Sequence, residues 1–255
     1  MKITFLGTGS SMGIPVIGCN CQVCRSTDPR DKRLRSSVLV QDNNTIILID
    51  ASPDFRYQAL KYFNTNRIDA VLITHAHRDH VAGLDDLRPF MFLHQKEPIK
   101  IFAESKTIES IKQLFYYSFE ENPYPGSPIF SLNTIDLTPF YINDIKIIPI
   151  RVIHGSWEIL GFRIGDFTYI TDANKIPESE IVKITGTKVL VVNALRRKEH
   201  YAHFSLSQAV DFIKRISPNM GFITHMAHRI GKHQDLEKEL PENIKPAYDG
   251  LTLYI

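Results

Sequence analysis

Short apolar runs rich in Ile, Val and Leu recur along the chain and are separated by polar turns. Runs of about four to eight such residues are typical of strands buried in a sheet. They predict strands at 3–6, 38–40, 45–50, 69–73, 99–103, 145–150, 161–164, 167–172, 188–195, 221–224 and 251–254. Longer stretches between them predict helices at 54–63, 105–117, 205–216 and 232–239. We therefore expect strands and helices to be interleaved along the whole chain.

Potential metal ligands follow directly after the strand expected at 69–73. Residues 74–80 read Thr-His-Ala-His-Arg-Asp-His. His75 and His77 are two residues apart, so in an extended chain their side chains point the same way, whereas the adjacent Asp79 and His80 cannot. This arrangement suits two metal ions better than one, and imidazole with carboxylate suits zinc, iron or manganese. The alternative is a polar loop with incidental histidines, which four ligand-type residues so close together disfavour.

Three cysteines form a second cluster near the N-terminus: Cys19, Cys21 and Cys24. In a reducing compartment such a cluster favours metal binding over disulfides. Zinc takes four ligands, so a fourth must come from elsewhere, and a histidine is the natural choice. A fully ligated zinc has no open position, which predicts a structural site. A redox-active or free-thiol cluster is the alternative.

Composition narrows the possible classes of protein. The chain has 255 residues, of which 43% are hydrophobic, and a net charge of +2. This length allows one large or two small domains, and the modest charge gives no electrostatic sign of nucleic-acid binding. The strand expected at 3–6 leaves no room for a signal peptide, and no apolar run reaches the length of a membrane span. An odd number of cysteines argues against a secreted disulfide framework, so we expect a cytoplasmic protein.

A glycine-rich turn, Gly7–Ser11, follows the first expected strand. Such a turn could cradle phosphate, but it lacks the third glycine and the lysine of nucleotide-binding loops. We interpret it first as backbone geometry and only second as a substrate contact.

Residues 75–80, His-Ala-His-Arg-Asp-His, resemble the H-x-H-x-D-H signature of the metallo-β-lactamase-fold hydrolases. Residues 83–90, Gly-Leu-Asp-Asp-Leu-Arg-Pro-Phe, are similar to one subgroup, the phosphoribosyl cyclic-phosphate phosphodiesterases of phosphonate breakdown and their relatives. The resemblance covers nearly the whole chain. It implies an α/β fold, an αββα sandwich of two mixed sheets flanked by helices, as a single domain over 1–255.

The resemblance also implies a ligand set for two metal ions. The first ion would be held by His75, His77 and His154, and the second by Asp79, His80 and His225. Asp172 would bridge the two ions, opposite a water whose pKa the ions lower toward about 7. Asp50 would support the motif from behind, although a helix cap is an equally good interpretation of this aspartate.

Two further roles come from the same resemblance. His203, just before the N-terminus of the helix expected at 205–216, would be the catalytic residue that is not a ligand, with Asp79 counted as catalytic as well. His203 would stabilise the charge on the phosphoryl oxygens or protonate the leaving alkoxide. His200 is the alternative and ranks below it. His228 would complete a structural zinc site with Cys19, Cys21 and Cys24.

The function that these observations favour is a metal-dependent phosphodiesterase acting on a small cyclic phosphate of the phosphoribosyl 1,2-cyclic phosphate type. Its cofactors would be two divalent ions, zinc or manganese, and one structural zinc. We expect its binding partner to be a small phosphodiester and expect it to bind neither a membrane nor a nucleic acid. The sequence does not decide between a monomer and a homodimer.

Three alternatives share the fold. A tRNA 3′-processing endonuclease would need a long glycine-rich and basic insertion, which the chain lacks. A β-lactamase is the second alternative. The third is a non-hydrolytic, metal-dependent binding protein like the relative in pyrroloquinoline quinone biosynthesis. No metal position is substituted in this chain, which argues against that third class.

Overall fold

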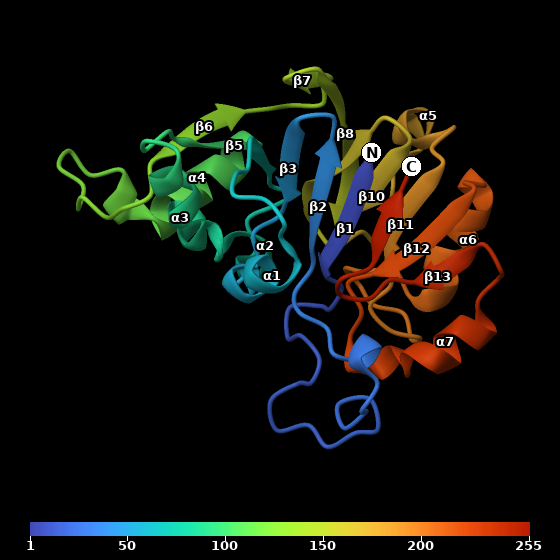
Figure 1. Ribbon diagram of the computed structural model, residues 1–255. Coiled ribbons are helices and arrows are strands. Elements are labelled where there is room, and N and C mark those ends of the chain that lie inside the picture. The colour runs from blue at the N-terminus through green and yellow to red at the C-terminus, as the bar shows by residue number, and fades with distance from the viewer.

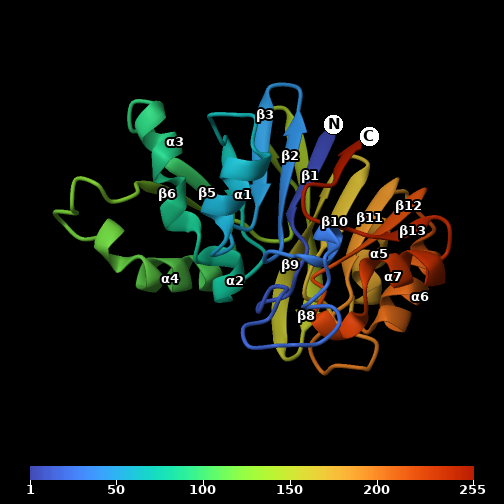
Figure 2. The same cartoon turned by 60° about the horizontal axis from the view of Figure 1, so that its bottom comes forward.

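Two β-sheets lie face to face between two layers of helices in a computed structural model that describes residues 1–255 (Figures 1 and 2). Each sheet has seven strands. The first has the order β14-β1-β2-β3-β4-β5-β6, with β1 (Lys2–Gly7), β2 (Ser37–Asp42), β3 (Thr45–Ile49), β4 (Ala70–Leu72), β5 (Ile99–Ala103), β6 (Phe130–Thr134) and β14 (Thr252–Tyr254). The second has the order β13-β12-β11-β10-β9-β8-β7, with β7 (Phe140–Ile142), β8 (Ile145–His154), β9 (Trp157–Ile164), β10 (Phe167–Ile170), β11 (Val189–Asn193), β12 (Met220–Thr224) and β13 (Ile244–Pro246).

The helices divide between the two outer faces. On the first sheet lie α1 (Phe55–Tyr62), α2 (Arg78–Val81), α3 (Arg88–Leu93) and α4 (Ser105–Leu114), and on the second lie α5 (Glu178–Ile184), α6 (Leu206–Ile216) and α7 (His233–Glu239) (Figure 1). Four 3₁₀ turns complete the set: Pro29–Asp31, Leu84–Leu87, Tyr116–Ser118 and His228–Ile230. The predicted α/β fold with two mixed sheets flanked by helices is confirmed.

Alternation along the strands builds three separate apolar layers. In β3, Ile47 and Ile49 pack into the cluster between the sheets, whereas Leu48 packs under the helices of the first sheet. In β11, Val191 faces the other sheet and Val192 faces the outer helices. Because successive side chains of a strand point to opposite faces, strands buried on both faces are apolar throughout. This explains why the apolar runs of the sequence located the strands so well.

Both sheets change from antiparallel to parallel pairing along their width. Strands β3 to β6 pair in parallel, and so do β10 to β13. Parallel strands end at the same edge, so the segments that follow β3, β4, β10 and β12 meet at one end of the sandwich. Polar loops at the carboxyl ends of parallel strands are where α/β proteins place their sites.

Several element boundaries differ from those expected. β8 and β9 form a long hairpin whose register runs from Ile147↔Ile164 to His154↔Trp157, so β9 begins at Trp157 rather than at 161. The helix expected at 105–117 ends at Leu114 and continues as a 3₁₀ turn. The strands β6, β7 and β13 were not predicted.

The glycines of the turn after β1 are needed for close backbone packing. A Cβ on Gly7 would lie 2.0 Å from the carbonyl oxygen of Arg35, and one on Gly9 would lie 2.9 Å from that of Arg33. Ser10 N–H donates to the carbonyl of Met226, at 3.1 Å, just beyond the end of β12. The interpretation of this turn as backbone geometry is therefore confirmed.

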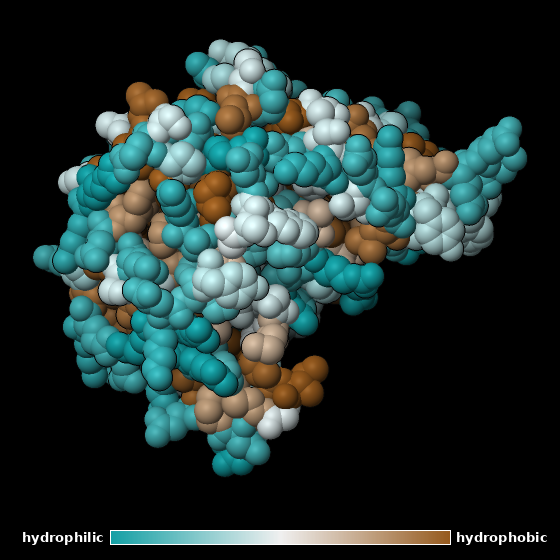
Figure 3. Space-filling model, turned by 180° about the vertical axis from the view of Figure 1, so that it is seen from behind, coloured by the Kyte–Doolittle hydropathy of each residue, from teal (hydrophilic) through white to brown (hydrophobic).

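A long loop between β1 and β2 projects from the end of the sandwich where the parallel strands terminate (Figure 1). Seen from behind, apolar side chains gather near its tip (Figure 3), and the exposed Met12 and Ile17 belong to this loop. No helix combines the length and the apolar character that a membrane crossing requires.

Candidate metal centre

The segment after β4, the end of β8 and the segments after β10 and β12 converge on one buried cluster of histidines and carboxylates. Three ligand groups, each with ligand atoms within 4.8 Å of one another, contain the residues expected at the dinuclear centre: His75 with His77 and His154, Asp79 with His80 and His225, and Asp172 with His75 and His80. The structure therefore brings together all seven expected ligands.

The first group is organised by backbone and ring contacts. His75 Nε2 lies 2.9 Å from His77 Nδ1. The Nδ1 atom of His154 lies 2.8 Å from the carbonyl oxygen of Ala202, to which it donates a hydrogen bond. A donated hydrogen bond at one ring nitrogen fixes the tautomer and leaves the other nitrogen as a metal ligand.

The second group depends on Asp50. This carboxylate is fully buried, accepts from the backbone N–H of Thr74 at 2.9 Å and lies 2.7 Å from Nδ1 of His80. It therefore holds His80 with Nε2 directed at Asp79 and Asp172, each 3.3 Å away. Asp54, and not Asp50, occupies the N-cap position of α1. The geometry thus favours the supporting role of Asp50 over the helix-cap interpretation.

Asp172 lies between the two groups. One of its oxygens is 3.1 Å from Nδ1 of His225 and 3.3 Å from Nε2 of His80, and the side chain also groups with His154 and His203. Asp50, Asp172 and His225 all have positive φ, at 60°, 58° and 53°. Strained backbone of this kind persists where the surrounding structure enforces it, and it clusters at functional sites.

Protonation states in the centre suit cation binding. Burial, with His80 nearby, lowers the pKa of His75 well below its ordinary value, so its imidazole is neutral. Burial alone would raise the pKa of Asp172, but His225 and His80 outweigh it and keep this carboxylate ionised. Neutral imidazole and ionised carboxylate are the forms that bind metals.

The donor set passes a direct test of whether it fits a metal ion. Nε2 of His80 is buried without a hydrogen-bond partner, although it faces two carboxylates. Burial lowers the pKa of His80, but Asp79, Asp172 and Asp50 together raise it well above its ordinary value. Such a large increase in the pKa of His80 shows that the site attracts positive charge. A divalent cation bound to Nε2 would supply that charge.

The three cysteines form a separate cluster with His228. Nδ1 of His228 lies 3.2 Å from Sγ of Cys19 and 3.4 Å from Sγ of both Cys21 and Cys24. The backbone N–H of Cys24 donates to Cys21 and is the main reason that the pKa of Cys21 falls to about 6, whereas burial raises that of Cys24 to about 11. Three sulfurs and one imidazole around a single point suit tetrahedral zinc and favour a structural site over a redox cluster.

His203 lies over the predicted metal centre, and His200 does not. The ring centroid of His203 is 4.7 Å from that of His154 and 5.1 Å from that of His225, and its Nδ1 is 3.7 Å from Asp172. Burial lowers the pKa of His203 to about 3. His200 lies farther out, belongs to no ligand group and accepts a hydrogen bond from the backbone of Ala202. This placement agrees with the ranking of the two histidines.

Sequence reasoning missed three residues beside the centre. Ser36 Oγ lies 3.2 Å from Nδ1 of His225. Ala202 contributes only its carbonyl, which no side-chain pattern can reveal. Trp157, the one tryptophan of the chain, packs against His77 with ring centroids 4.7 Å apart and planes tilted by 32°. Its position three residues after His154, at the start of the next strand, was the available signal.

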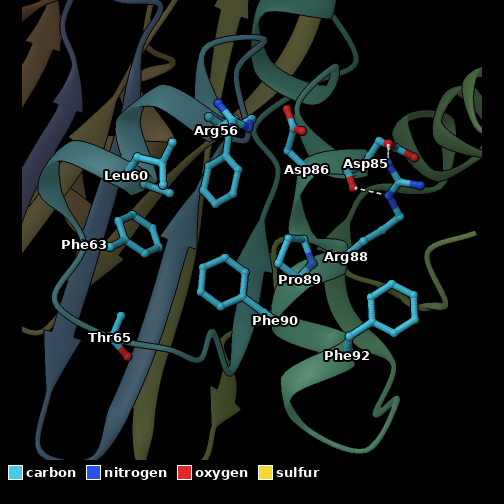
Figure 4. A pocket seen from close by; sticks show the side chains of 12 residues that line it. Arg56, Leu60, Phe63, Thr65, Asp85, Asp86, Arg88, Pro89, Phe90 and Phe92 are labelled. Carbon is cyan, nitrogen blue, oxygen red and sulfur yellow. Dashed lines mark hydrogen bonds and ion pairs between the residues drawn. The ribbon is translucent and has the colours of Figure 1, made fainter. Parts of the chain in front are cut away.

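The largest cavity lies elsewhere. It has a volume of about 710 Å³ and is lined by residues of α1 and of the segment that runs into α3. Figure 4 shows Phe63 and Phe90 on one side of it, with Arg88 paired to Asp85 across from them. It contains none of the metal-ligating residues, so the largest cavity and the candidate chemistry are separate.

Comparison with known proteins gives a consistent picture of the fold. Residues 45–226 match the family model described as a beta-lactamase superfamily domain. A crystal structure described as a new diphosphatase from the PhnP family is 37% identical, has a TM-score of 0.93, and is matched over 100% of this chain and 97% of that one. The Zn²⁺-bound PqqB from Methylobacterium extorquens has a TM-score of 0.77 and covers both chains fully, but at 19% identity it is similar in fold alone.

A curated relative is considerably longer. An octanoyltransferase from Porphyromonas gingivalis is 42% identical over 259 residues, which covers 100% of this chain and 52% of that protein. The chain therefore spans about half the length of that relative.

Proposed function

Because the chain belongs to the PhnP family within the beta-lactamase superfamily, we propose that it is a metal-dependent phosphodiesterase acting on a small phosphodiester. Membership in this superfamily supports a metal-dependent hydrolase, and the choice of a phosphodiester is our proposal. The first candidate substrate is a cyclic phosphate of the phosphoribosyl 1,2-cyclic phosphate type.

The observation that carries the proposal is the pair of ligand groups joined by Asp172. His75, His77 and His154 would hold one ion, and Asp79, His80 and His225 the other. When bound, two such ions supply a hydroxide nucleophile at neutral pH and offset charge on the phosphoryl oxygens. A phosphodiester carries its negative charge on those oxygens, so it suits this centre.

The chain's own residues would position the substrate. His203 packs over His154 and His225, and its buried Nδ1, 3.7 Å from Asp172, has no hydrogen-bond partner. Because its pKa is lowered to about 3, the imidazole is neutral and its N–H can donate a hydrogen bond to a phosphoryl oxygen, whereas protonating the leaving alkoxide would need the imidazolium form. Asp50 keeps His80 in the tautomer that presents Nε2. The cysteine cluster with His228 ties the projecting N-terminal loop to the segment after His225, and so fixes one wall of the site.

A diphosphate substrate is a second candidate, since the structure at 37% identity is described as a diphosphatase. The same centre could attack a phosphoric anhydride, because the phosphoryl group is the same and only the leaving group differs. The name octanoyltransferase belongs to a protein about twice as long, so it does not assign acyl transfer to the region that matches here.

Phosphorus NMR tests the proposal. The manganese- or zinc-loaded protein should convert phosphoribosyl 1,2-cyclic phosphate to the 1,5-bisphosphate, and Asp172→Asn should abolish the conversion. Activity on a generic phosphodiester or on a diphosphate diester instead would support phosphoryl hydrolysis and exclude the cyclic phosphate as the substrate. Inactivity on all three would contradict the phosphodiesterase proposal and favour the nuclease or the binding-protein alternative.

A further inference from the structure

A smaller cavity of about 230 Å³ lies directly against the metal-ligating motif. His75 and Ala76 form part of its lining, the first turns of α4 another part, and the start of β9 a third. Cavities for drug-sized ligands usually measure about 300–1,000 Å³. This one therefore suits a single ring system rather than a whole substrate, and a group attached to a phosphate at the metal centre could reach it.

Trp157 provides a flat face beside this cavity. It lies opposite His154 in the β8–β9 register, lines the cavity, and is 49% exposed. Its indole is held against the His77 imidazole, with planes 32° apart, so its orientation is fixed by a residue of the metal centre. Tryptophan is large and highly buried on average, and a half-exposed indole beside a catalytic centre is a ready stacking platform.

The charges around the cavity argue against a second phosphate as its occupant. Glu104 and Glu158 line it together with one cation, Lys106. Arg151 pairs with both oxygens of Glu104, at 2.6 and 2.8 Å, and so only balances that carboxylate. Glu104 also occupies the N-cap position of α4, where its negative charge offsets the helix dipole. With no surplus of positive charge, the cavity suits an uncharged ring.

Hydroxyl groups in the lining are free to bind the edge of such a ring. Thr107 is buried and Ser156 is exposed, and neither side chain forms a hydrogen bond within the protein. Specific ligand cavities combine flat apolar walls with a few such polar groups. A heterocycle with donors and acceptors on its edge satisfies both features, whereas a ribose ring has no aromatic face to stack on the indole.

We infer that this cavity binds the nucleobase of the substrate, with Trp157 as its stacking surface, so that the substrate is a nucleoside phosphodiester. This inference rests on the proposed function, because the phosphate is placed at the metal centre. It narrows the substrate class and ranks nucleoside phosphodiesters above the phosphoribosyl 1,2-cyclic phosphate considered first, because a cyclic ribose phosphate without a base would leave Trp157 uncovered.

Tryptophan fluorescence tests base binding independently of turnover, because Trp157 is the one tryptophan of the chain. Adenosine 5′-monophosphate should quench the emission of the zinc-loaded protein saturably, and ribose 5-phosphate should not. Free N-acetyltryptophanamide corrects for absorption by the nucleotide. No saturable quenching, or equal quenching by both compounds, would overturn the inference whether or not the protein is a phosphodiesterase.

Kinetics provide the second test. Adenosine 2′,3′-cyclic phosphate and methyl riboside 2,3-cyclic phosphate share the cyclic ribose phosphate, and a methoxy group replaces adenine in the second compound. We expect kcat/KM to be about 10- to 100-fold higher for the nucleotide, as for stacking of one base. Trp157→Ala should abolish this preference and Trp157→Phe should keep part of it. Equal rates on both compounds in the unmodified protein, or a preference that survives Trp157→Ala, would overturn the inference.

Two further variants control for structural damage. Thr107→Val keeps the side-chain volume and should alter the preference between adenine and uracil compounds without changing metal content. Tyr141→Ala removes another exposed aromatic residue, from the distant strand β7, and should leave the nucleotide preference intact. A loss of preference in Tyr141→Ala as well would contradict a local role for Trp157. If adenosine 5′-monophosphate quenches the fluorescence but neither cyclic phosphate is hydrolysed, the proposed function is contradicted and the nucleobase site is supported.

Discussion

His80 has the most demanding environment in the centre, because it is fully buried among three carboxylates. One of them, Asp50, binds Nδ1 at 2.7 Å and leaves Nε2 for a metal ion. Residues that orient a ligand in this way typically contribute 10- to 100-fold to metal affinity. The role of Asp50 can therefore be separated from that of the ligands themselves.

We predict that Asp50→Asn weakens metal binding at the dinuclear centre by about 10- to 100-fold. The amide cannot act as the anionic acceptor for the His80 N–H. Competition titration with a chromogenic chelator would measure the change. Asp136→Asn alters a fully exposed aspartate and should leave the affinity unchanged. Unchanged affinity in Asp50→Asn would contradict the supporting role.

We predict that His203→Gln lowers turnover of a phosphodiester by about 10²- to 10³-fold, the usual effect of removing one hydrogen-bond donor to the transition state. Metal content should stay the same, because His203 belongs to neither of the two proposed triads, although it groups with His154 and Asp172. Steady-state kinetics with metal analysis would check both quantities. If turnover survives while the metals remain bound, His203 is not the catalytic residue.

The sequence revealed these residues unevenly, for a physical reason. His75, His77, Asp79 and His80 leave one strand end together, so their proximity in sequence reflects proximity in space. His154, Asp172 and His225 come from other strands, and only the family resemblance assigned them. The roles of Trp157 and of the Ala202 carbonyl were not predicted, because neither belongs to a sequence motif.

The loop between β1 and β2 has little regular structure and depends on its contacts with the rest of the chain. Its cysteine cluster joins His228, which begins the 3₁₀ turn after β12. A small apolar cluster of Ile14, Val23 and Cys24 is the other core of this loop. Such a small core cannot hold a long loop alone, which makes the metal site the main constraint.

We predict that Cys21→Ser removes one tightly held zinc per chain and lowers the free energy of unfolding by at least about 2 kcal/mol, or about 4–8 °C in Tm for a chain of this size. Metal analysis and thermal unfolding would measure these effects. The exposed Asn20 offers a matched control, and Asn20→Ala should change neither quantity. Normal zinc content and stability in Cys21→Ser would contradict a structural zinc site.

At the scale of elements, the strands buried on both faces were the easiest to predict. Continuous apolar runs such as Val189–Asn193 mark them clearly. The missed strands β6, β7 and β13 are short or only partly buried, and β13 ends in Pro246 at a sheet edge, which is where proline is tolerated. Their pairing is imposed by neighbouring strands and not by their own pattern.

The two halves of the chain are held together by buried polar contacts as well as by the core. Arg33, from the loop before β2, is buried and hydrogen-bonded to Thr8 and to Nδ1 of His233, at 2.8 and 3.1 Å. Burial, together with Arg33 and Arg30, lowers the pKa of His233 to about 4. Protonation of His233 therefore opposes folding.

We predict that this histidine makes stability depend on pH. Its folded pKa lies below the unfolded value of about 6.5, so the unfolded state binds more protons between pH 6.5 and 4. Its stabilising contribution is complete above pH 6.5 and is lost as pH falls toward 4, by at most about 1.36 kcal/mol per pH unit. Urea unfolding across this range would measure the slope.

His233→Asn supplies the comparison, because its amide oxygen can still accept from Arg33. At pH 7.5 the variant should have the same free energy of unfolding as the unmodified protein, and it should lose less of it on acidification. An identical slope in the two proteins would contradict this account of His233.

The whole account depends on two metal ions acting together in phosphodiester hydrolysis. Its most direct test is to titrate manganese into protein whose dinuclear centre has been stripped and whose cysteine cluster keeps its zinc, while following hydrolysis of bis(p-nitrophenyl) phosphate. The account predicts that the rate rises to a plateau at two equivalents of added metal. Full activity without added metal, a plateau at one equivalent, or no activity at any ratio would contradict it.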